Sequence, residues 1–388
     1  MLDESLLDAP EALALADRHD LLRGAAEAGA RVRTAVRHAT ESGLTGLKPD
    51  GRPRAVLIAG PGTAAVGVAD LLGALASPSC PVIRLAPTGV APAAGALRWS
   101  LPGWVGPVDL LLIATPDGTE PGLPLLAEQA YRRGCTVVAV APDRSPLAES
   151  VTGSHGLTVP LAAPPHPAAR GGGDDGGEAE APAAAPGTLW ALLVPLLILL
   201  DRTGLVSAPV EALEKAADRL DAVAERCGPA IATYSNPAKT LAAELAEALP
   251  LIWTEGQGAG PAGRRFAAAL AELAGHAALA AELPEALPAH ATLLAGGGPG
   301  GADSDDFFRD RVEDPAPLRA RVVLLRDRPA DAGGLTAAPA ARELAHSHDT
   351  AVSDLEPEDG GDLERLAELI AITDFAAVYL ALASGSRS

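Results

Sequence analysis

The chain has 388 residues, a formal net charge of −20 at pH 7 and a pI of about 4.7. This length is enough for two or three domains of about 100–200 residues each. The negative charge opposes nucleic-acid backbones and anionic bilayers, because long-range repulsion acts before local contacts form. We therefore expect neither nucleic acid nor a membrane as a partner. Aromatic residues make up only 3% of the chain, so its core must consist mainly of Ala, Val and Leu.

Cysteine usage and the N-terminal sequence bear on the location of the protein. The three cysteines, Cys80, Cys135 and Cys227, are odd in number and widely spaced, which argues against disulfides and against a zinc site. The first residues, MLDESLLDAP, are acidic where a secretory signal is basic. The most apolar run, 189–200, contains a proline and is shorter than the roughly 20 residues that span a bilayer. These features predict a cytoplasmic protein.

The first half of the chain has the pattern of an α/β domain. Residues 1–50 have helical spacing of leucines and valines and form a predicted helical N-terminal segment. Short β-branched runs then alternate with Ala-rich stretches of helix length. This alternation predicts a parallel, doubly wound sheet with helices on both faces. The expected strands are 55–59, 81–86, 108–114, 136–141 and 156–160.

A second α/β series follows a segment without periodicity. Residues 162–187 are dominated by Gly, Pro, Ala and acidic residues, which is typical of a disordered linker. Two helical stretches and a last apolar-faced helix from 363 to about 383 accompany the second series, and that helix suits a lobe boundary or a dimer interface. We therefore predict two similar domains, 51–161 and 188–388. The expected strands of the second are 229–234, 249–254, 290–296 and 321–327.

Two turns at the ends of neighbouring predicted strands are candidate ligand sites. The first, AGPGTAAVGVAD (59–70), places Gly62 and Thr63 at the start of a helix, where backbone N–H groups can hold an anion. It lacks the third glycine and the following acidic residue of a dinucleotide fingerprint. A tight turn with a helix cap explains the same residues equally well.

The second turn, ATPDGTEPG (114–122), follows the strand 108–114. Gly118 belongs to the turn, Thr119 is a predicted helix N-cap, and Glu120 falls in the expected first helical turn. Ligands of doubly wound sheets lie outside the carboxyl ends of the strands, so this turn is the first candidate for the site. A well-capped helix without a ligand is the alternative.

Several segments together resemble the SIS (sugar isomerase) domain family. They include IAGPGTAAVGVADLL (58–72), LLLIATPDGTEPGLPLLAEQAYRRGCTVVAV (110–140), SNPAKTLAAELAEALPLIW (235–253) and ITDFAAVYLAL (372–382). Within that family, the chain is similar to the bifunctional phosphoglucose/phosphomannose isomerase type and looks especially like the actinobacterial SIS-domain proteins called TobH. The resemblance covers about residues 50 to 385. It implies two tandem SIS domains and a homodimer that uses neither metal nor cofactor.

The resemblance also implies a sugar-phosphate site at the second turn. In the family this turn carries several hydroxyl groups that hold the phosphate. Here Thr119 and Glu120 match the family motif, whereas its serines fall on Ala114 and Pro116, and Thr115 lies one position away. The family's arginine after the first domain has no match, and Arg170 is only a weak substitute.

Three residues in the second half correspond to the catalytic groups of the family. The resemblance places the general base on Glu272, while the ring-opening histidine falls on His290, about two residues late, or on His276, one helical turn after Glu272. The family's lysine becomes Gly275. From the residues alone, an alternative is open for each: Glu272 as an exposed residue on an Ala-rich helix, and His290 as a structural hydrogen-bonding group before a strand.

Two functions follow as hypotheses. The first is aldose–ketose isomerisation between glucose 6-phosphate or mannose 6-phosphate and fructose 6-phosphate, with a glutamate base acting through an enediol. Its predicted catalytic residues are Glu272, His290 and His276, and its predicted substrate contacts are Gly62, Thr63, Thr115, Gly118 and Thr119. The second is a protein that has lost catalysis and binds a phosphosugar or nucleotide sugar as a sensor or partner.

Overall fold

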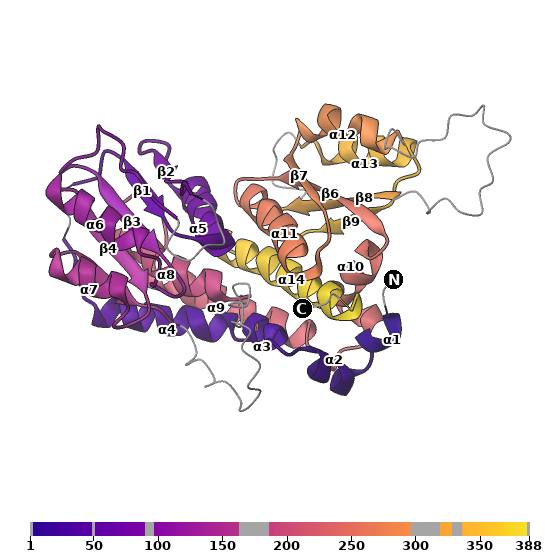
Figure 1. Cartoon of the computed structure of the whole chain (residues 1–388). Coiled ribbons are helices and arrows are strands. Elements are labelled where there is room, and N and C mark those ends of the chain that lie inside the picture. The colour runs from indigo at the N-terminus through magenta and orange to yellow at the C-terminus, as the bar shows by residue number, and fades with distance from the viewer. Residues whose placement is uncertain are drawn as a thin grey trace. The chain divides into compact units, whose positions relative to one another are not determined.

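The computed structural model in Figure 1 describes residues 3–48, 51–89, 97–162, 186–295, 319–327 and 336–385. The chain divides into two compact units. The first unit comprises residues 19–222, and the second unit combines residues 1–18 with residues 223–388. Each contains one parallel sheet flanked by helices, so the predicted fold class is confirmed. The predicted linker, 162–187, lies almost entirely outside the described residues.

The sheet of the first unit has five parallel strands in the order β2-β1-β3-β4-β5. Its three central strands are almost completely buried apolar runs, as expected for a sheet covered on both faces. The strands are β1 (Val56–Ala59), β2 (Val82–Arg84), β3 (Leu110–Ala114), β4 (Thr136–Ala141) and β5 (Leu157–Pro160).

Alternate residues of these strands face two different layers of helices. One face, which includes Leu57, Leu111 and Val137, packs against α6 (Gly122–Arg132) and α7 (Pro146–Gly153). On the other side, α8 (Thr188–Arg202) contacts β4 and packs against α4 (Ala28–Glu41) and α5 (Gly62–Leu75). The remaining helices of this unit are α3 (Leu21–Ala26), the 3-10 turn η1 (Leu44–Gly46) and α9 (Val210–Arg226), whose last residues belong to the second unit.

The sheet of the second unit repeats the same local order with four strands, β7-β6-β8-β9. All neighbouring pairs are parallel. The strands are β6 (Ala248–Glu255), β7 (Leu279–Glu282), β8 (Arg319–Arg326) and β9 (Val352–Leu355).

Helices cover both faces of this second sheet, as Figure 1 shows. Leu251, Trp253 and Leu324 pack against α12 (Ala286–Leu294) and α13 (Ala338–Ser347). On the opposite face, α11 approaches the sheet so closely that a Cβ on Gly263 would lie 2.4 Å from the Thr254 side chain. The other helices of the unit are α1 (Glu4–Leu7), α2 (Pro10–Ala16), the 3-10 turn η2 (Thr233–Ser235), α10 (Pro237–Leu245), α11 (Ala259–Ala274) and α14 (Asp362–Ala383).

Two of the predicted strands of the second half are wrong. Residues 229–234 form a turn that leads into η2, because Lys239 Nζ donates to the carbonyls of Pro229 and Ile231 and holds the backbone in that turn. Residues 290–294 belong to helix α12. The signal was present in the sequence, since Ala286, His290 and Leu294 are buried at i, i+4 and i+8. The Ala-rich strand β7 and the short strand β9 were not predicted.

The last helix, α14, is longer than the other apolar helices of the described chain. It is long and apolar enough to cross a membrane by length and composition, yet 94% of its most apolar window is buried inside the protein. It packs against α10 and α11, and its buried residues include Phe375 and Tyr379. Its apolar side chains therefore pack inside the second unit.

Candidate functional site

The carboxyl edge of the first sheet brings the two predicted turns together. In the order β2-β1-β3, successive strands are added on opposite sides of β1, and the crevice at such a switch point is where ligands of open α/β sheets bind. A Cβ on Gly60 would lie only 2.0 Å from the carbonyl oxygen of Ala114. The turn after β1 therefore touches the turn after β3, and only glycine permits this approach.

The turn after β1 leads into a helix whose N-cap residue provides no capping side chain. Gly62 has a φ of +72° and begins α5, and its N-cap residue, Pro61, makes no side-chain capping bond. Gly62 is exposed and Thr63 is half-buried. The first N–H groups of a helix and its dipole attract anions, so this turn has the chemistry of a phosphate site.

The polar groups of the turn after β3 form hydrogen bonds with one another. Thr115 is completely buried, and its hydroxyl donates to Asp117 Oδ1 at 3.2 Å while accepting from the N–H of Gly118 at 3.1 Å. Asp117 Oδ1 also accepts from the N–H of Thr119 at 3.0 Å. The Thr115 hydroxyl is therefore part of the turn, and the exposed Asp117 carboxylate would repel a phosphate placed there.

The helix after this turn begins later than predicted. It starts at Gly122, so Thr119 is not its N-cap and Glu120 is not in its first turn. A Cβ on Gly122 would lie 2.4 Å from the carbonyl oxygen of Leu97 and 3.0 Å from the Trp99 ring. Leu97 and Trp99 therefore cover the start of α6, whereas the N-cap residue of α5 provides no capping side chain.

In the second sheet, the helix start that corresponds to that of α5 is occupied by a carboxylate of the chain itself. Asp327 follows β8, and its Oδ2 accepts from the N–H groups of Gly258 at 2.6 Å and Ala259 at 3.3 Å, at the start of α11. Gly256 has a φ of +121°, and a Cβ there would lie 1.6 Å from Asp327 Oδ1. An anion approaching α11 would meet this carboxylate. Sequence reasoning missed Asp327, although an acidic residue directly after an apolar strand was a visible signal.

Further charged groups close the same edge of the second sheet. Glu255, the last residue of β6, accepts from Arg326 Nε at 3.0 Å, from the Thr336 hydroxyl at 2.7 Å and from the N–H of Ala337 at 2.5 Å. Burial would raise the pKa of Glu255, but these three hydrogen bonds outweigh it and lower the pKa. Arg326 also pairs with Glu356. The charged side chains at this edge therefore bond to one another in an ion-pair network.

His290, a predicted ring-opening acid, serves the core of the second unit. It is 8% exposed, and its Nδ1 accepts from Trp253 Nε1 at 2.8 Å. Burial lowers the pKa of His290, because the charged imidazole would lose its hydration. The structure therefore holds a neutral, hydrogen-bonded histidine on α12.

Glu272 and His276 lie at the opposite edge of the second sheet. The helix α11 ends at Ala274 and Gly275 adopts the left-handed conformation, so His276 is beyond the helix and not one turn after Glu272 as predicted. His276 Nε2 contacts the carbonyl oxygen of Ala248, the first residue of β6, at 2.9 Å. Since α11 has 16 residues and is about 24 Å long, the exposed Glu272 is far from the carboxyl ends of these strands.

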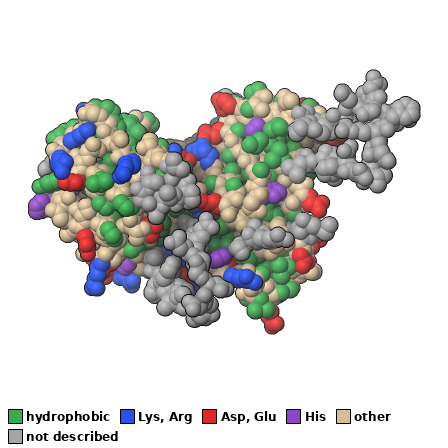
Figure 2. Space-filling model, viewed as in Figure 1, with side chains coloured by type: hydrophobic (Ala, Val, Ile, Leu, Met, Phe, Trp, Pro, Cys, Tyr) green, Lys and Arg blue, Asp and Glu red, His purple; other side chains and the backbone are tan. Residues whose placement is uncertain are grey.

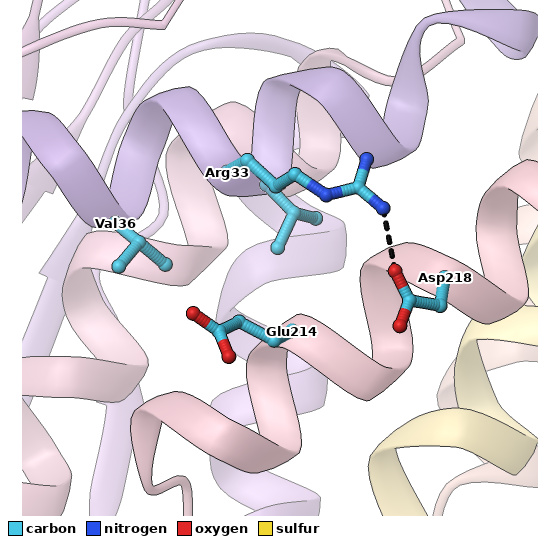
Figure 3. Close-up of a pocket in the computed structure, with 5 residues that line it drawn as sticks. Arg33, Val36, Glu214 and Asp218 are labelled. Atoms are coloured by element: carbon cyan, nitrogen blue, oxygen red, sulfur yellow. Dashed lines mark hydrogen bonds and ion pairs between the residues drawn. The ribbon is translucent and has the colours of Figure 1, made fainter.

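A surface cavity of about 300 Å³ lies between α4 and α9, as Figure 3 shows. A Cβ on Gly29 would lie 2.1 Å from Asp221 Oδ1, so the two helices meet closely there and leave the cavity further along. Arg33 is already paired with Asp218 and Asp221, both at 2.7 Å. With these carboxylates and Glu214 at its rim, the cavity does not suit a phosphosugar. Its lining residues are Val32, Arg33, Val36, Glu214 and Asp218.

Figure 2 shows how charged side chains are distributed on one face of the protein. On the face shown, Lys and Arg side chains of the described residues stand singly or in small groups, several of them beside Asp or Glu side chains. Arg170, the weak substitute for the family's arginine, lies outside the described residues.

Comparisons with known proteins agree with this architecture. Residues 234–386 match the family described as bacterial phospho-glucose isomerase C-terminal SIS domain. None of the curated proteins matches the sequence. Among solved structures, a hypothetical protein from Thermus thermophilus is 14% identical with a TM-score of 0.60, covering 97% of this chain and 89% of the other.

Two further structures belong to proteins with named activities. The C-terminal domain of glucosamine-fructose-6-phosphate aminotransferase from Francisella tularensis is 12% identical with a TM-score of 0.56, covering 95% of this chain and 97% of the other. The tagatose-6-phosphate ketose/aldose isomerase from Escherichia coli is 13% identical with a TM-score of 0.52, covering 94% and 92%. At these identities the likeness concerns the fold. The chain thus has an SIS fold like that of phosphosugar isomerases.

Proposed function

We propose that this protein binds a sugar phosphate at the carboxyl edge of the first sheet, with the phosphate at the N-terminus of α5. The observation that carries the proposal is the contrast between the two sheets. Neither Pro61 of α5 nor Gly258 of α11 caps its helix with its own side chain, but at α11 the carboxylate of Asp327 accepts from the first N–H groups. The substrate class is suggested by the SIS fold and by the C-terminal family match.

The turn after β3 suits the sugar and not the phosphate. The Asp117 carboxylate is exposed and keeps Oδ2 for an external donor, while Thr119 is exposed beside it. Carboxylates accept hydrogen bonds from hydroxyl groups, and threonine both donates and accepts. In this arrangement the phosphate binds at Thr63 and the sugar hydroxyls bind at Asp117 and Thr119.

A thermal-shift titration with glucose 6-phosphate and fructose 6-phosphate tests this proposal, with unphosphorylated glucose as the reference ligand. We expect both phosphates to raise the melting temperature and glucose to have little effect. Thr63→Asp should abolish the shift, because a carboxylate in the first turn takes the place of the ligand while favouring the helix dipole. Gly73→Asp adds the same charge at the exposed far end of α5 and should leave the shift intact. Equal shifts in wild type and Thr63→Asp would exclude this site.

Aldose–ketose isomerisation is the second candidate, and the family match over 234–386 supports it because that segment contains Glu272, His276 and His290. The geometry favours binding without turnover, since Glu272 and His276 lie away from the carboxyl edge of their sheet and His290 is engaged with Trp253. We therefore expect stabilisation by fructose 6-phosphate without formation of either aldose. Turnover by wild type that disappears in Glu272→Gln would favour the isomerase. The TobH-like subtype, the homodimer and the cytoplasmic location remain predictions.

A further inference from the structure

Arg31 is a buried cation whose guanidinium has more N–H donors than hydrogen-bond partners. Its side chain is only 9% exposed, and its Nη1 donates to the Thr188 hydroxyl at 3.2 Å. Its Nη2 lies 3.8 Å from the Glu27 carboxylate, which is beyond hydrogen-bond distance. Its Nε is buried without a hydrogen-bond partner. Burial lowers the pKa of Arg31, because the charged guanidinium loses hydration there.

This guanidinium is aimed at the start of a helix, where the sign of the field is also positive. Thr188 is the first residue of α8, a helix of 15 residues, and the N-cap residue Gly187 provides no capping side chain. A helix N-terminus carries a partial positive charge and favours anions. The buried arginine adds a further positive charge at the same place. Both groups would be stabilised by the same bound anion.

The surrounding backbone shapes this position closely. Gly187 has a φ of +88°, and a Cβ there would lie 2.5 Å from the carbonyl oxygen of Gly24. The junction between α3 and α4 is therefore packed directly onto the start of α8. Glu27, whose carboxylate lies 3.8 Å from Arg31 Nη2, is also held by Arg23 at 2.6 Å, so its charge is shared between two arginines. The local formal charge of Arg23, Glu27 and Arg31 is +1.

We propose that Arg31, the Thr188 hydroxyl and the N-terminus of α8 form a binding site for a phosphate-type oxyanion, separate from the sugar-phosphate site at α5. Such an ion presents several acceptor oxygens, which match the unused Nε–H of the guanidinium and the N–H groups of a helix start. The ligand is either free inorganic phosphate or the phosphate group of an ester.

Calorimetric titration with inorganic phosphate tests the site in a Thr63→Asp background, which keeps the α5 site out of the measurement. We expect one phosphate to bind, and Arg31→Gln to weaken its binding about tenfold or more, as expected for loss of charge-assisted hydrogen bonds. Arg37→Gln, on the exposed face of the same helix, should bind as the background protein does. Thr188→Val, which retains Arg31, should weaken binding to a smaller degree and serves if Arg31→Gln does not fold.

The outcomes separate this site from the proposed function. Absence of phosphate binding in the Thr63→Asp background overturns the site, as does equal affinity in that background with Arg31→Gln or Thr188→Val added. Competition by glucose 6-phosphate identifies an ester phosphate as an acceptable ligand, whereas binding of inorganic phosphate alone identifies the free ion. A sugar-phosphate shift that survives in Thr63→Asp and is lost when Arg31→Gln is added belongs to the Arg31 site, whereas a shift that survives both substitutions counts against the α5 site.

Discussion

Asp327 Oδ2 accepts a hydrogen bond from the backbone N–H of Gly258 at 2.6 Å. The residue that follows β8 therefore caps α11, the helix that follows the neighbouring strand β6. We predict that Asp327→Ala lowers the free energy of unfolding by about 0.5–2 kcal/mol, the usual effect of losing a helix N-cap. Asp327→Asn should cost less, because the amide oxygen can still accept the bond. Urea unfolding measures both changes. Glu343→Ala, an exposed substitution on α13, is the control, and an equally stable Asp327→Ala protein would contradict the capping role.

The Trp253–His290 pair predicts how stability depends on pH. Burial lowers the pKa of His290, so the folded state stays neutral where the unfolded chain takes up a proton, from about pH 6.5 downwards. The folded state then binds fewer protons than the unfolded state, and stability falls as the pH drops through this window. His290→Gln keeps an acceptor for Trp253 and does not titrate. In urea unfolding at pH 7.5 and 5.5, we expect the advantage of wild type over His290→Gln to shrink at the lower pH. A constant difference would be evidence against this linkage.

The three cysteines are all buried free thiols, which gives a prediction for their reactivity. Burial raises the pKa of Cys135 and of Cys227 to about 11, and it also raises the pKa of Cys80. Since the thiolate is the reactive form, the native protein should resist iodoacetamide at pH 7.5. All three thiols should react in concentrated urea, as intact-mass measurement would show. Rapid labelling of any of them in the native protein would contradict the described burial.

The strands and turns of the first unit could be predicted because their signals are local. The apolar runs at β1, β3 and β4 and the glycines at 60, 62 and 118 are visible in the sequence and lie at one sheet edge. The inward orientation of the Thr115 hydroxyl was not predictable, since it depends on the position that the fold gives to Asp117. The cap formed by Asp327 joins residues 69 positions apart, which only the pairing of β6 with β8 brings together.

Lys239 is a fully buried cation that fixes the turn before α10, and its removal should weaken the second unit. Its Nζ donates to the carbonyl oxygens of Pro229 at 2.8 Å and Ile231 at 2.7 Å. Methionine has a similar length but no donor, so Lys239→Met should lower the free energy of unfolding by about 1–3 kcal/mol. Urea unfolding measures this loss, and Lys215→Met, on the exposed side of α9, should change stability by less than about 0.5 kcal/mol. If both variants unfold at the wild-type midpoint, the two carbonyl contacts do not stabilise the turn.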